Sequence, residues 1–188
     1  ALEPFTWPAN PRRRGGRFFG DGRFHGPDGR GRMLAVVAPA VSDAGGFRLN
    51  TGRIRDQWHT MTRTAKSPRL SAHLAEPFLE LHPADAARLG LQTADLAEVT
   101  NTFGRAILRV LVTDRVAPGH PFAPIHWTGQ TAPSGRIDVL VAANPDPISG
   151  QPDSKGTGVA VARFAASWYG FAVSATDFQP DAAYWAKA

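Results

Sequence analysis

Residues 96–113, which read LAEVTNTFGRAILRVLVT, decide the fold class. Two runs rich in aliphatic and β-branched side chains, Leu96–Thr100 and Arg105–Thr113, flank Asn101–Gly104. A short polar connection that contains glycine, placed between two such runs, is typical of a β-hairpin. Every second residue from Leu108 to Val112 is apolar, so these side chains share one face of a strand. The stretch predicts two antiparallel strands with one buried face.

Similar short segments occur on both sides of this hairpin. The chain of 188 residues carries 19 glycines and 16 prolines, which favours many turns over long helices. Pro83–Leu89 predicts a helix of two turns, because proline suits its first position and Gly90 follows its end. Six or seven strands with one or two short helices indicate a β-barrel or sandwich. The further expected barrel strands are Phe47–Asn50, Phe78–His82, Phe122–His126, Ile137–Val141 and Val159–Phe164, and Met33–Val37 is an expected strand of the lead-in.

The composition divides the chain into three expected parts. Residues 1–46 form an extended lead-in rich in Arg, Gly and Pro, with one strand. Residues 47–166 form the barrel. Residues 167–188 carry six aromatic side chains, too many for a disordered tail, so we expect this extension to pack on the barrel or to lead into another domain.

The charge is uneven along the chain. Residues 1–69 hold 12 Arg and one Lys against five acids, a net charge of +8, whereas residues 70–188 hold eight basic and 11 acidic residues, a net charge of −3. Arginine binds phosphate through two parallel hydrogen bonds, so an Arg-rich half suggests an anionic partner. A nucleic-acid-binding β-barrel is therefore one hypothesis, with the Arg12–Arg17 run as its basic arm. GC-rich coding, which also prefers Arg to Lys, is the alternative explanation.

Several kinds of chemistry are absent from the sequence. No cysteine is present, which excludes disulfides, a thiol nucleophile and thiolate metal ligands within this chain and fits a reducing, cytoplasmic location. The six histidines show no metal-binding spacing, and no phosphate-binding glycine loop or nucleophile elbow occurs. No apolar run is long enough to span a membrane. We expect a binding domain with no catalytic or metal-ligating residue of its own.

Two neighbouring motifs are the first candidates for a binding site. Asn50, Thr51, Gly52 and Arg53 end a strand, where glycine allows close backbone approach and arginine offers a cation for a pyrophosphate. An ordinary strand end with an exposed arginine has the same pattern. The second motif follows at once and combines an aromatic plate, an imidazole and hydroxyl groups, which suits a flat heterocycle and its phosphate arm. Its residues are Trp58, His59, Thr60, Met61 and Thr62.

A third candidate group lies later in the chain. His126 and Trp127 are followed by Asp138, which can accept hydrogen bonds from the amino groups of a base. A turn at 146–152 then precedes Lys155, which can pair with a phosphate. Each of these residues, taken alone, is more often an ordinary surface or core residue.

Taken together, the motifs resemble a known family. Leu49–Arg53, Gln57–Arg63, Ile125–Trp127 and Asp146–Pro152 with Lys155 occur in the order seen in the C-terminal molybdopterin-dinucleotide-binding domain of nitrate reductases, in the dimethyl sulfoxide reductase superfamily. The resemblance covers nearly the whole chain and is greatest for the catalytic subunit of the cytoplasmic assimilatory enzymes.

The resemblance implies a mainly β fold, a double-psi β-barrel, and a molybdenum ion held by two molybdopterin guanine dinucleotides. Thr51, Gly52 and Arg53 would contact cofactor phosphate and pterin, and Lys155 would contact the cofactor. His126 would lie where periplasmic relatives carry a phenylalanine-type residue near the active-site funnel. The second motif would line the same channel as the first.

Three departures from the family pattern accompany this resemblance. Asp138 stands where relatives carry Asn, which adds a negative charge beside a polyanionic cofactor. Ala94 precedes Asp95 where the family often has Gly, so that turn is expected to change type. The cysteines that ligate molybdenum and an iron–sulfur cluster lie in earlier domains of the family, so this chain alone is not expected to reduce nitrate.

Three hypotheses make different structural predictions. A cofactor-binding domain, with the remaining enzyme domains as its partners and neither membrane nor nucleic acid among them, requires Arg53, His59 and Lys155 to converge. A nucleic-acid-binding barrel requires a continuous basic stripe on its outer surface. A partner-docking module without ligand predicts that the region from Thr51 to Thr62 packs on itself.

Overall fold

The computed structural model describes residues 18–37 and 46–187. The chain divides into two compact units, residues 1–40 and 41–188, and each is considered by itself. The Arg12–Arg17 run lies outside the described residues.

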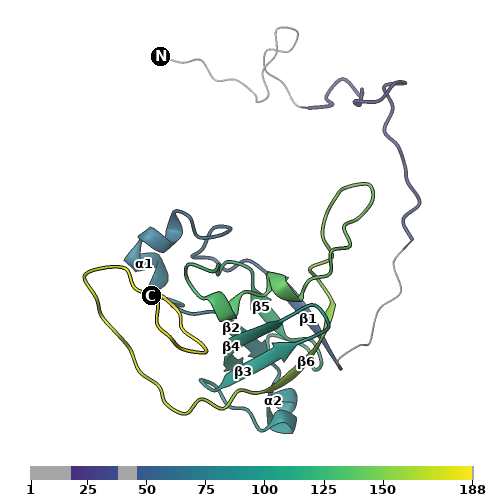
Figure 1. The fold of residues 1–188 in the computed structure, drawn as a ribbon. Coiled ribbons are helices and arrows are strands. Elements are labelled where there is room, and N and C mark those ends of the chain that lie inside the picture. The colour runs from purple at the N-terminus through teal and green to yellow at the C-terminus, as the bar shows by residue number, and fades with distance from the viewer. Residues whose placement is uncertain (1–17, 38–45, 188) are drawn as a thin grey trace. The chain divides into compact units, whose positions relative to one another are not determined.

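The second unit is built on a closed barrel of six strands (Figure 1). Neighbouring strands around the barrel follow the order β1-β5-β2-β4-β3-β6. The β1/β5 and β2/β4 pairs are parallel and the other four are antiparallel. This closed, mixed barrel confirms the mainly β prediction and agrees with the double-psi type. The strands are β1 (Phe47–Gly52), β2 (Phe78–Leu81), β3 (Leu96–Thr100), β4 (Arg105–Val112), β5 (Phe122–Pro124) and β6 (Thr157–Arg163).

The hairpin that decided the fold class is present as β3 and β4. Leu96 pairs with Arg109 and Thr100 with Arg105, in antiparallel register. The Asn101 side chain shapes the connection, because its Oδ1 accepts from the backbone N–H groups of Phe103 and Gly104. Such Asx turns let a short connection reverse the chain.

The barrel interior is one apolar cluster. Alternate residues of the strands supply it, and sixteen side chains are buried there, including Leu49, Leu79, Val99 and Leu108, each 0% exposed. Burial of a large aliphatic side chain stabilises a fold by about 1.5–3 kcal/mol. The cluster is therefore the main source of the stability of the barrel.

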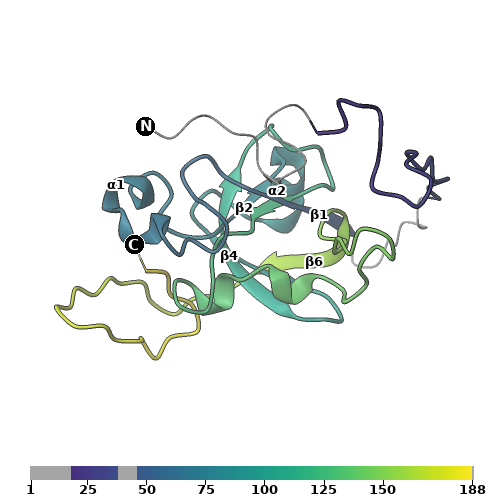
Figure 2. The same ribbon diagram turned by 90° about the horizontal axis from the view of Figure 1, so that it is seen from above.

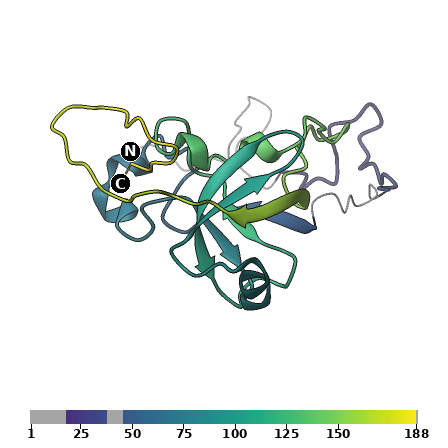
Figure 3. The ribbon, with the colours of Figure 1, turned by 60° about the horizontal axis from the view of Figure 1, so that its bottom comes forward.

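Two α-helices accompany the barrel. Helix α2 (Pro83–Leu89) matches its predicted bounds and lies at one end of the barrel (Figure 3). The His82 side chain caps it by accepting from Ala84 N–H, and Gly90 ends it with φ +65°. Helix α1 (Pro68–Ser71) and the 3₁₀ turns η1 (Thr64–Lys66) and η2 (Pro133–Gly135) were not expected. These are single turns that carry no periodic sequence signal.

Two expected strands are wrong. Ile137–Val141 contains the 3₁₀ turn η3 (Asp138–Leu140) instead of a strand. Ile137, which precedes the turn, and Leu140, which ends it, are buried. These two residues are three apart, the spacing of a 3₁₀ turn rather than of a strand. Met33–Val37 in the first unit forms no strand, since nothing described there pairs with it, and its Met33 and Val37 side chains are fully or largely exposed.

Ala94 adopts a left-handed turn although it is not glycine. Its φ is +75°, a conformation that normally favours glycine. The turn is held because Asp95 Oδ2 accepts from Gln92 N–H at 2.7 Å and Arg109 donates to the Ala94 carbonyl at 2.8 Å. Tertiary contacts therefore outweigh the local preference.

The segment after β6 leaves the barrel and returns to it. It carries exposed Trp168, Phe171 and Phe178 along its outward course. Its last described residues come back beside α1, as the yellow ribbon shows in Figures 1 and 2. Within residues 18–37 and 46–187, no helix has the length and apolarity needed to cross a membrane.

Candidate functional site

The C-terminal end of β1 is the point where the predicted site residues meet. Thr51 is buried, and its Oγ1 donates to the carbonyl of Ser154. The Lys155 ammonium donates to the Thr51 carbonyl, and Gly156 N–H donates to Leu49 O at 2.9 Å. The predicted lysine, about a hundred residues away in the sequence, therefore lies against the first motif.

Gly52 allows this close approach. A Cβ atom at this position would lie 2.9 Å from Phe122 Cε2 and 3.9 Å from Lys155 Nζ. The first distance is shorter than real Cβ contacts, so any larger residue would displace the Phe122 ring. Here glycine is required for space because the backbone of β1 passes close to Phe122 of β5, whereas the sequence had suggested close approach of a ligand.

His126 ties the end of β1 to the Trp-His loop. Its side chain is 0% exposed; Nε2 accepts from Ile54 N–H at 2.9 Å, and Nδ1 lies 2.7 Å from the carbonyl oxygen of His59. A carbonyl can only accept and an N–H can only donate, so the ring is neutral with its proton on Nδ1. Burial lowers the pKa of His126, which keeps it in this form. Both ring nitrogens are used to hold backbone.

The loop that His126 holds has an unusual backbone. His59 and Met61 have φ values of +45° and +60°, in the left-handed region, although neither is glycine. The left-handed conformation costs an L-residue roughly 1–2 kcal/mol. Such residues persist only when their surroundings fix them, and they are frequent at binding sites. The Met61 N–H donates to the Trp58 carbonyl at 2.9 Å and closes the turn.

A second, small apolar cluster supports this loop. Met61, Trp127 and Ala132 are buried together, and Ile54 and Ala186 pack against them. Met61 and Trp127 are 4% and 5% exposed. These two predicted site residues therefore face the protein interior, where they fix the loop.

Other predicted residues present their side chains to solvent around the same loop. The Trp58 ring is 60% exposed, and the Arg53 guanidinium lies 5.9 Å from its centre, a cation–π distance. The hydroxyls of Thr60 and Thr62 are 3.0 Å apart. The side chains that are free to contact a ligand are Asn50, Arg53, Trp58, His59, Thr60, Thr62 and Lys155.

Gln57 begins the Gln57–Arg63 motif and was not among the predicted site residues. It is 5% exposed, and its Oε1 is the one buried side-chain atom of the described residues without a hydrogen-bond partner. An unmet acceptor in a protein interior is costly, and such atoms call for an explanation. Its position directly before Trp58 was the one sequence signal that could have identified it as a site residue. Only a donor that enters the protein interior could satisfy it.

Asp138 has no hydrogen bond or ion pair with this group in the described part of the chain. It begins η3, its side chain is 74% exposed, and its nearest charge is Arg136 at 3.7 Å. The turn at 146–152 is organised by Asp146, whose Oδ1 accepts from the N–H groups of Ile148 and Ser149. Hydrogen bonds from Ser149 and then from Ile148 lower the pKa of Asp146. This turn precedes Lys155 and leads the chain back to β1.

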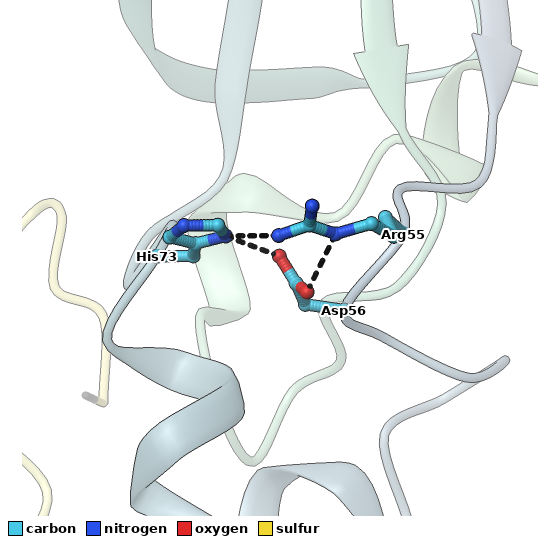
Figure 4. A network of polar contacts seen from close by, with 3 residues as sticks. All are labelled: Arg55, Asp56 and His73. Atoms are coloured by element: carbon cyan, nitrogen blue, oxygen red, sulfur yellow. Dashed lines mark hydrogen bonds and ion pairs between the residues drawn. The ribbon is translucent and has the colours of Figure 1, made fainter.

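A polar network connects the site to the turn after α1 (Figure 4). Asp56 accepts from Arg55 Nε at 3.1 Å, and His73 Nδ1 lies 2.7 Å from the other Asp56 oxygen. The hydrogen bond from His73, and next that from Arg55, lowers the pKa of Asp56. The network joins the residues before Gln57 to the segment that follows α1 and was not foreseen.

The charges around the barrel separate into paired and unpaired groups. Within the described residues Arg53 and Lys155 have no carboxylate partner. Within these same ranges Arg48, Arg63, Lys66 and Arg69 also lack one, whereas eight other cations of this unit are paired. The paired arginines are Arg55, Arg88, Arg105, Arg109, Arg115, Arg136 and Arg163.

These residues fit a nucleotide-bearing ligand. Two cations without carboxylate partners suit a pyrophosphate, and an exposed indole suits a flat ring. The unmet Gln57 oxygen suits an N–H or O–H donor. Three or more His, Asp or Glu side chains arranged to hold a metal ion do not occur in the described ranges.

Comparison with known proteins gives the same assignment. Residues 47–158 match the family described as "Molydopterin dinucleotide binding domain". A nitrate reductase of Klebsiella oxytoca is 43% identical over 174 residues, covering 90% of this chain and 20% of that protein. A nitrate reductase of Shewanella frigidimarina is 30% identical over 182 residues, covering 82% and 19%. The chain thus spans about a fifth of the length of these relatives.

A solved structure supports the fold. Acetylene hydratase from Pelobacter acetylenicus superposes with a TM-score of 0.54 at 19% identity, covering 63% of this chain and 18% of that one. The resemblance noted in the sequence is confirmed at the level of the family. By its barrel, its motifs and these matches, the chain belongs to the molybdopterin dinucleotide binding domain family.

Proposed function

We propose that this chain holds the guanine dinucleotide arms of a molybdenum bis(molybdopterin guanine dinucleotide) cofactor. It does so as the C-terminal domain of a cytoplasmic, assimilatory nitrate reductase that converts nitrate to nitrite. When bound, the cofactor supplies the redox chemistry of molybdenum. The residues of this chain bind and orient its arms, and an iron–sulfur cluster belongs to other domains of the enzyme.

One observation carries the proposal: the end of β1 brings Arg53 and Lys155 together with the exposed Trp58 loop. A guanidinium and an ammonium neutralise a pyrophosphate, at about 1.5–3 kcal/mol for each charge-assisted hydrogen bond. The hydroxyls of Thr60 and Thr62 can donate to phosphate or ribose oxygens. His126 and Trp127 act from the interior by fixing the loop.

Asp138 is the weakest member of the proposed cofactor set. Its carboxylate is exposed and faces Arg136. We propose that the Asp138 carboxylate contacts an amino group of the base, at the far end of an extended cofactor arm. Asp138→Asn, which restores the residue of related enzymes, should therefore leave nucleotide content unchanged or raise it, whereas a fall would argue for a specific role of the charge.

The nitrate assignment rests on similarity. Two relatives at 43% and 30% identity are named nitrate reductases, and the sequence motifs point to the assimilatory branch. Nitrate reduction by the complete enzyme, with a reduced viologen as electron donor, tests the substrate. Cell fractionation tests the cytoplasmic location.

The nucleic-acid hypothesis gains no support from the barrel. Seven of its arginines are paired with carboxylates, which makes them less available to a phosphate backbone. The Arg12–Arg17 arm lies outside the described residues.

The decisive experiment measures the nucleotide released by acid from the purified complete enzyme, relative to molybdenum. Mass spectrometry should find guanine nucleotide. Arg53→Gln and Lys155→Met should each lower the content several-fold, because each removes a phosphate contact. An exposed arginine on α1 supplies the matched control Arg69→Gln, which should retain it. Wild-type enzyme without guanine nucleotide would overturn the guanine assignment, and equal content in site and control variants would overturn the site.

A further inference from the structure

The C-terminal segment is fastened to the barrel by a partly buried polar anchor. Arg109 on β4 forms two hydrogen bonds to the Glu76 carboxylate, at 3.0 and 3.1 Å. The Tyr184 hydroxyl donates to the same carboxylate at 2.8 Å. Burial raises the pKa of Tyr184, so the phenol stays protonated and remains a donor. The anchor thus joins a residue near the chain end to the middle of the barrel.

Two tyrosines of the segment face the same guanidinium. The rings of Tyr169 and Tyr184 have their centres 5.7 and 5.9 Å from the Arg109 guanidinium carbon. Both distances lie within cation–π range. The segment therefore leaves the barrel beside Arg109 and returns beside Arg109, but only the returning tyrosine also bonds to Glu76.

The residues next to Tyr184 reach the loop of the proposed site. Ser134 Oγ donates to the Ala183 carbonyl at 2.7 Å, and Lys187 N–H donates to Thr131 O at 2.7 Å. Ala186 packs against the small cluster formed by Met61, Trp127 and Ala132. The chain end thus covers the apolar support of the Trp58–Met61 loop.

The Ala186 contact helps to hold the strained backbone of the loop. His59 and Met61 are held in the left-handed region, and Met61 is the only loop side chain in the small cluster. A cluster of three buried residues buries little apolar area, so the loss of one neighbour removes a large share of its stabilisation. Loss of the Ala186 cover would admit water to Met61 and allow the loop to relax to an unstrained conformation.

We propose that residues 183–187 form a latch for the Trp58–Met61 loop and that Tyr184 is its positioning residue. The latch holds the loop whether or not a ligand is bound. Its effect on cofactor retention rests, in addition, on the proposed function. Tyr184 acts through Ala186 and Met61 and touches neither substrate nor cofactor.

The two tyrosines offer a matched pair of variants in the complete enzyme. Tyr184→Ala removes the ring and the bond to Glu76, whereas Tyr169→Ala removes the same ring type from the same guanidinium and leaves residues 183–187 in place. We expect Tyr184→Ala to speed amide hydrogen exchange at 59–61 and 127–132 at least tenfold and Tyr169→Ala to change it less than twofold. Tyr184→Phe keeps the ring and should restore most of the protection.

A second measurement covers the cofactor. Dinucleotide loss during dilution should be several-fold faster in Tyr184→Ala than in Tyr169→Ala or Tyr184→Phe. Amides of β3 and β4 report whether the barrel is intact, and Ser134→Ala gives a milder loss of the latch if Tyr184→Ala does not fold. Equal exchange at 59–61 in the two alanine variants would overturn the latch. Enzyme that carries no dinucleotide would overturn the proposed function and leave the exchange comparison valid.

Discussion

The barrel core and the small cluster beneath the Trp58–Met61 loop are built in different ways. The core joins sixteen buried apolar side chains, twelve of them on strands, whereas the small cluster joins three, on loops that come from distant parts of the chain. The core keeps its backbone in strands; the small cluster holds His59 and Met61 in the left-handed region. A large, regular core can stabilise a fold without special contacts, whereas a small one must rely on hydrogen bonds and on the chain end.

The largest expected effect tests the core. Leu108 is 0% exposed, so Leu108→Ala should cost about 2–5 kcal/mol in the free energy of unfolding. Met61→Ala should cost less globally, because its cluster has few members, and should raise exchange only near the loop. Chemical denaturation with hydrogen exchange separates the two results. Equal losses of global stability would mean that the clusters are one cooperative unit.

Acid should weaken the loop before it weakens the barrel. The pKa of His126 is lowered from its usual 6.5, so below pH 6.5 the unfolded chain binds a proton that the folded chain resists. Stability is therefore full above pH 6.5 and falls as the pH drops below it, by at most about 1.4 kcal/mol per pH unit. The melting temperature of wild type and His126→Gln between pH 7.5 and 5 measures this, and the variant should lose the dependence on this proton.

Backbone strain in the loop can be measured by comparing two substitutions at His59. His59→Gly and His59→Ala both remove the exposed imidazole, but only glycine tolerates φ +45° without strain. The glycine variant should be more stable than the alanine variant by about 1 kcal/mol. Thermal denaturation gives the difference. An alanine variant as stable as the glycine variant would show that the loop carries no strain there.

The smallest expected effect concerns the Arg55, Asp56 and His73 network. Asp56→Asn removes both pairings, yet the surroundings are exposed, so the melting temperature should barely change and only exchange near residue 57 should rise. The pKa of Asp56 is lowered from 3.8, so its contribution is present above that pH and disappears as the pH falls below it. Wild type and Asp56→Asn should therefore converge as the pH falls further below 3.8. A large thermal shift at pH 7 would assign the network a role in the barrel.

Sequence patterns located most of the fold because strands and caps are local features. The β3–β4 hairpin and α2 have their predicted bounds to within one residue, since alternation, proline and glycine act over a few positions. Ile137–Val141 was assigned the wrong element, because a short apolar run suits a strand or a 3₁₀ turn equally well. Met33–Val37 had strand character without a described partner to pair with.

By itself the sequence determined the barrel class, the family and the residues that gather at the end of β1. Only the tertiary structure decided which of those residues face solvent and which support the loop, because burial depends on chain segments far apart in sequence. It also revealed the unmet oxygen of Gln57 and the anchor of Tyr184 on Glu76. The Tyr184–Glu76 bond joins residues about a hundred positions apart, and the Gln57 oxygen lacks a partner only because of how distant segments pack around it. No local sequence pattern encodes either feature.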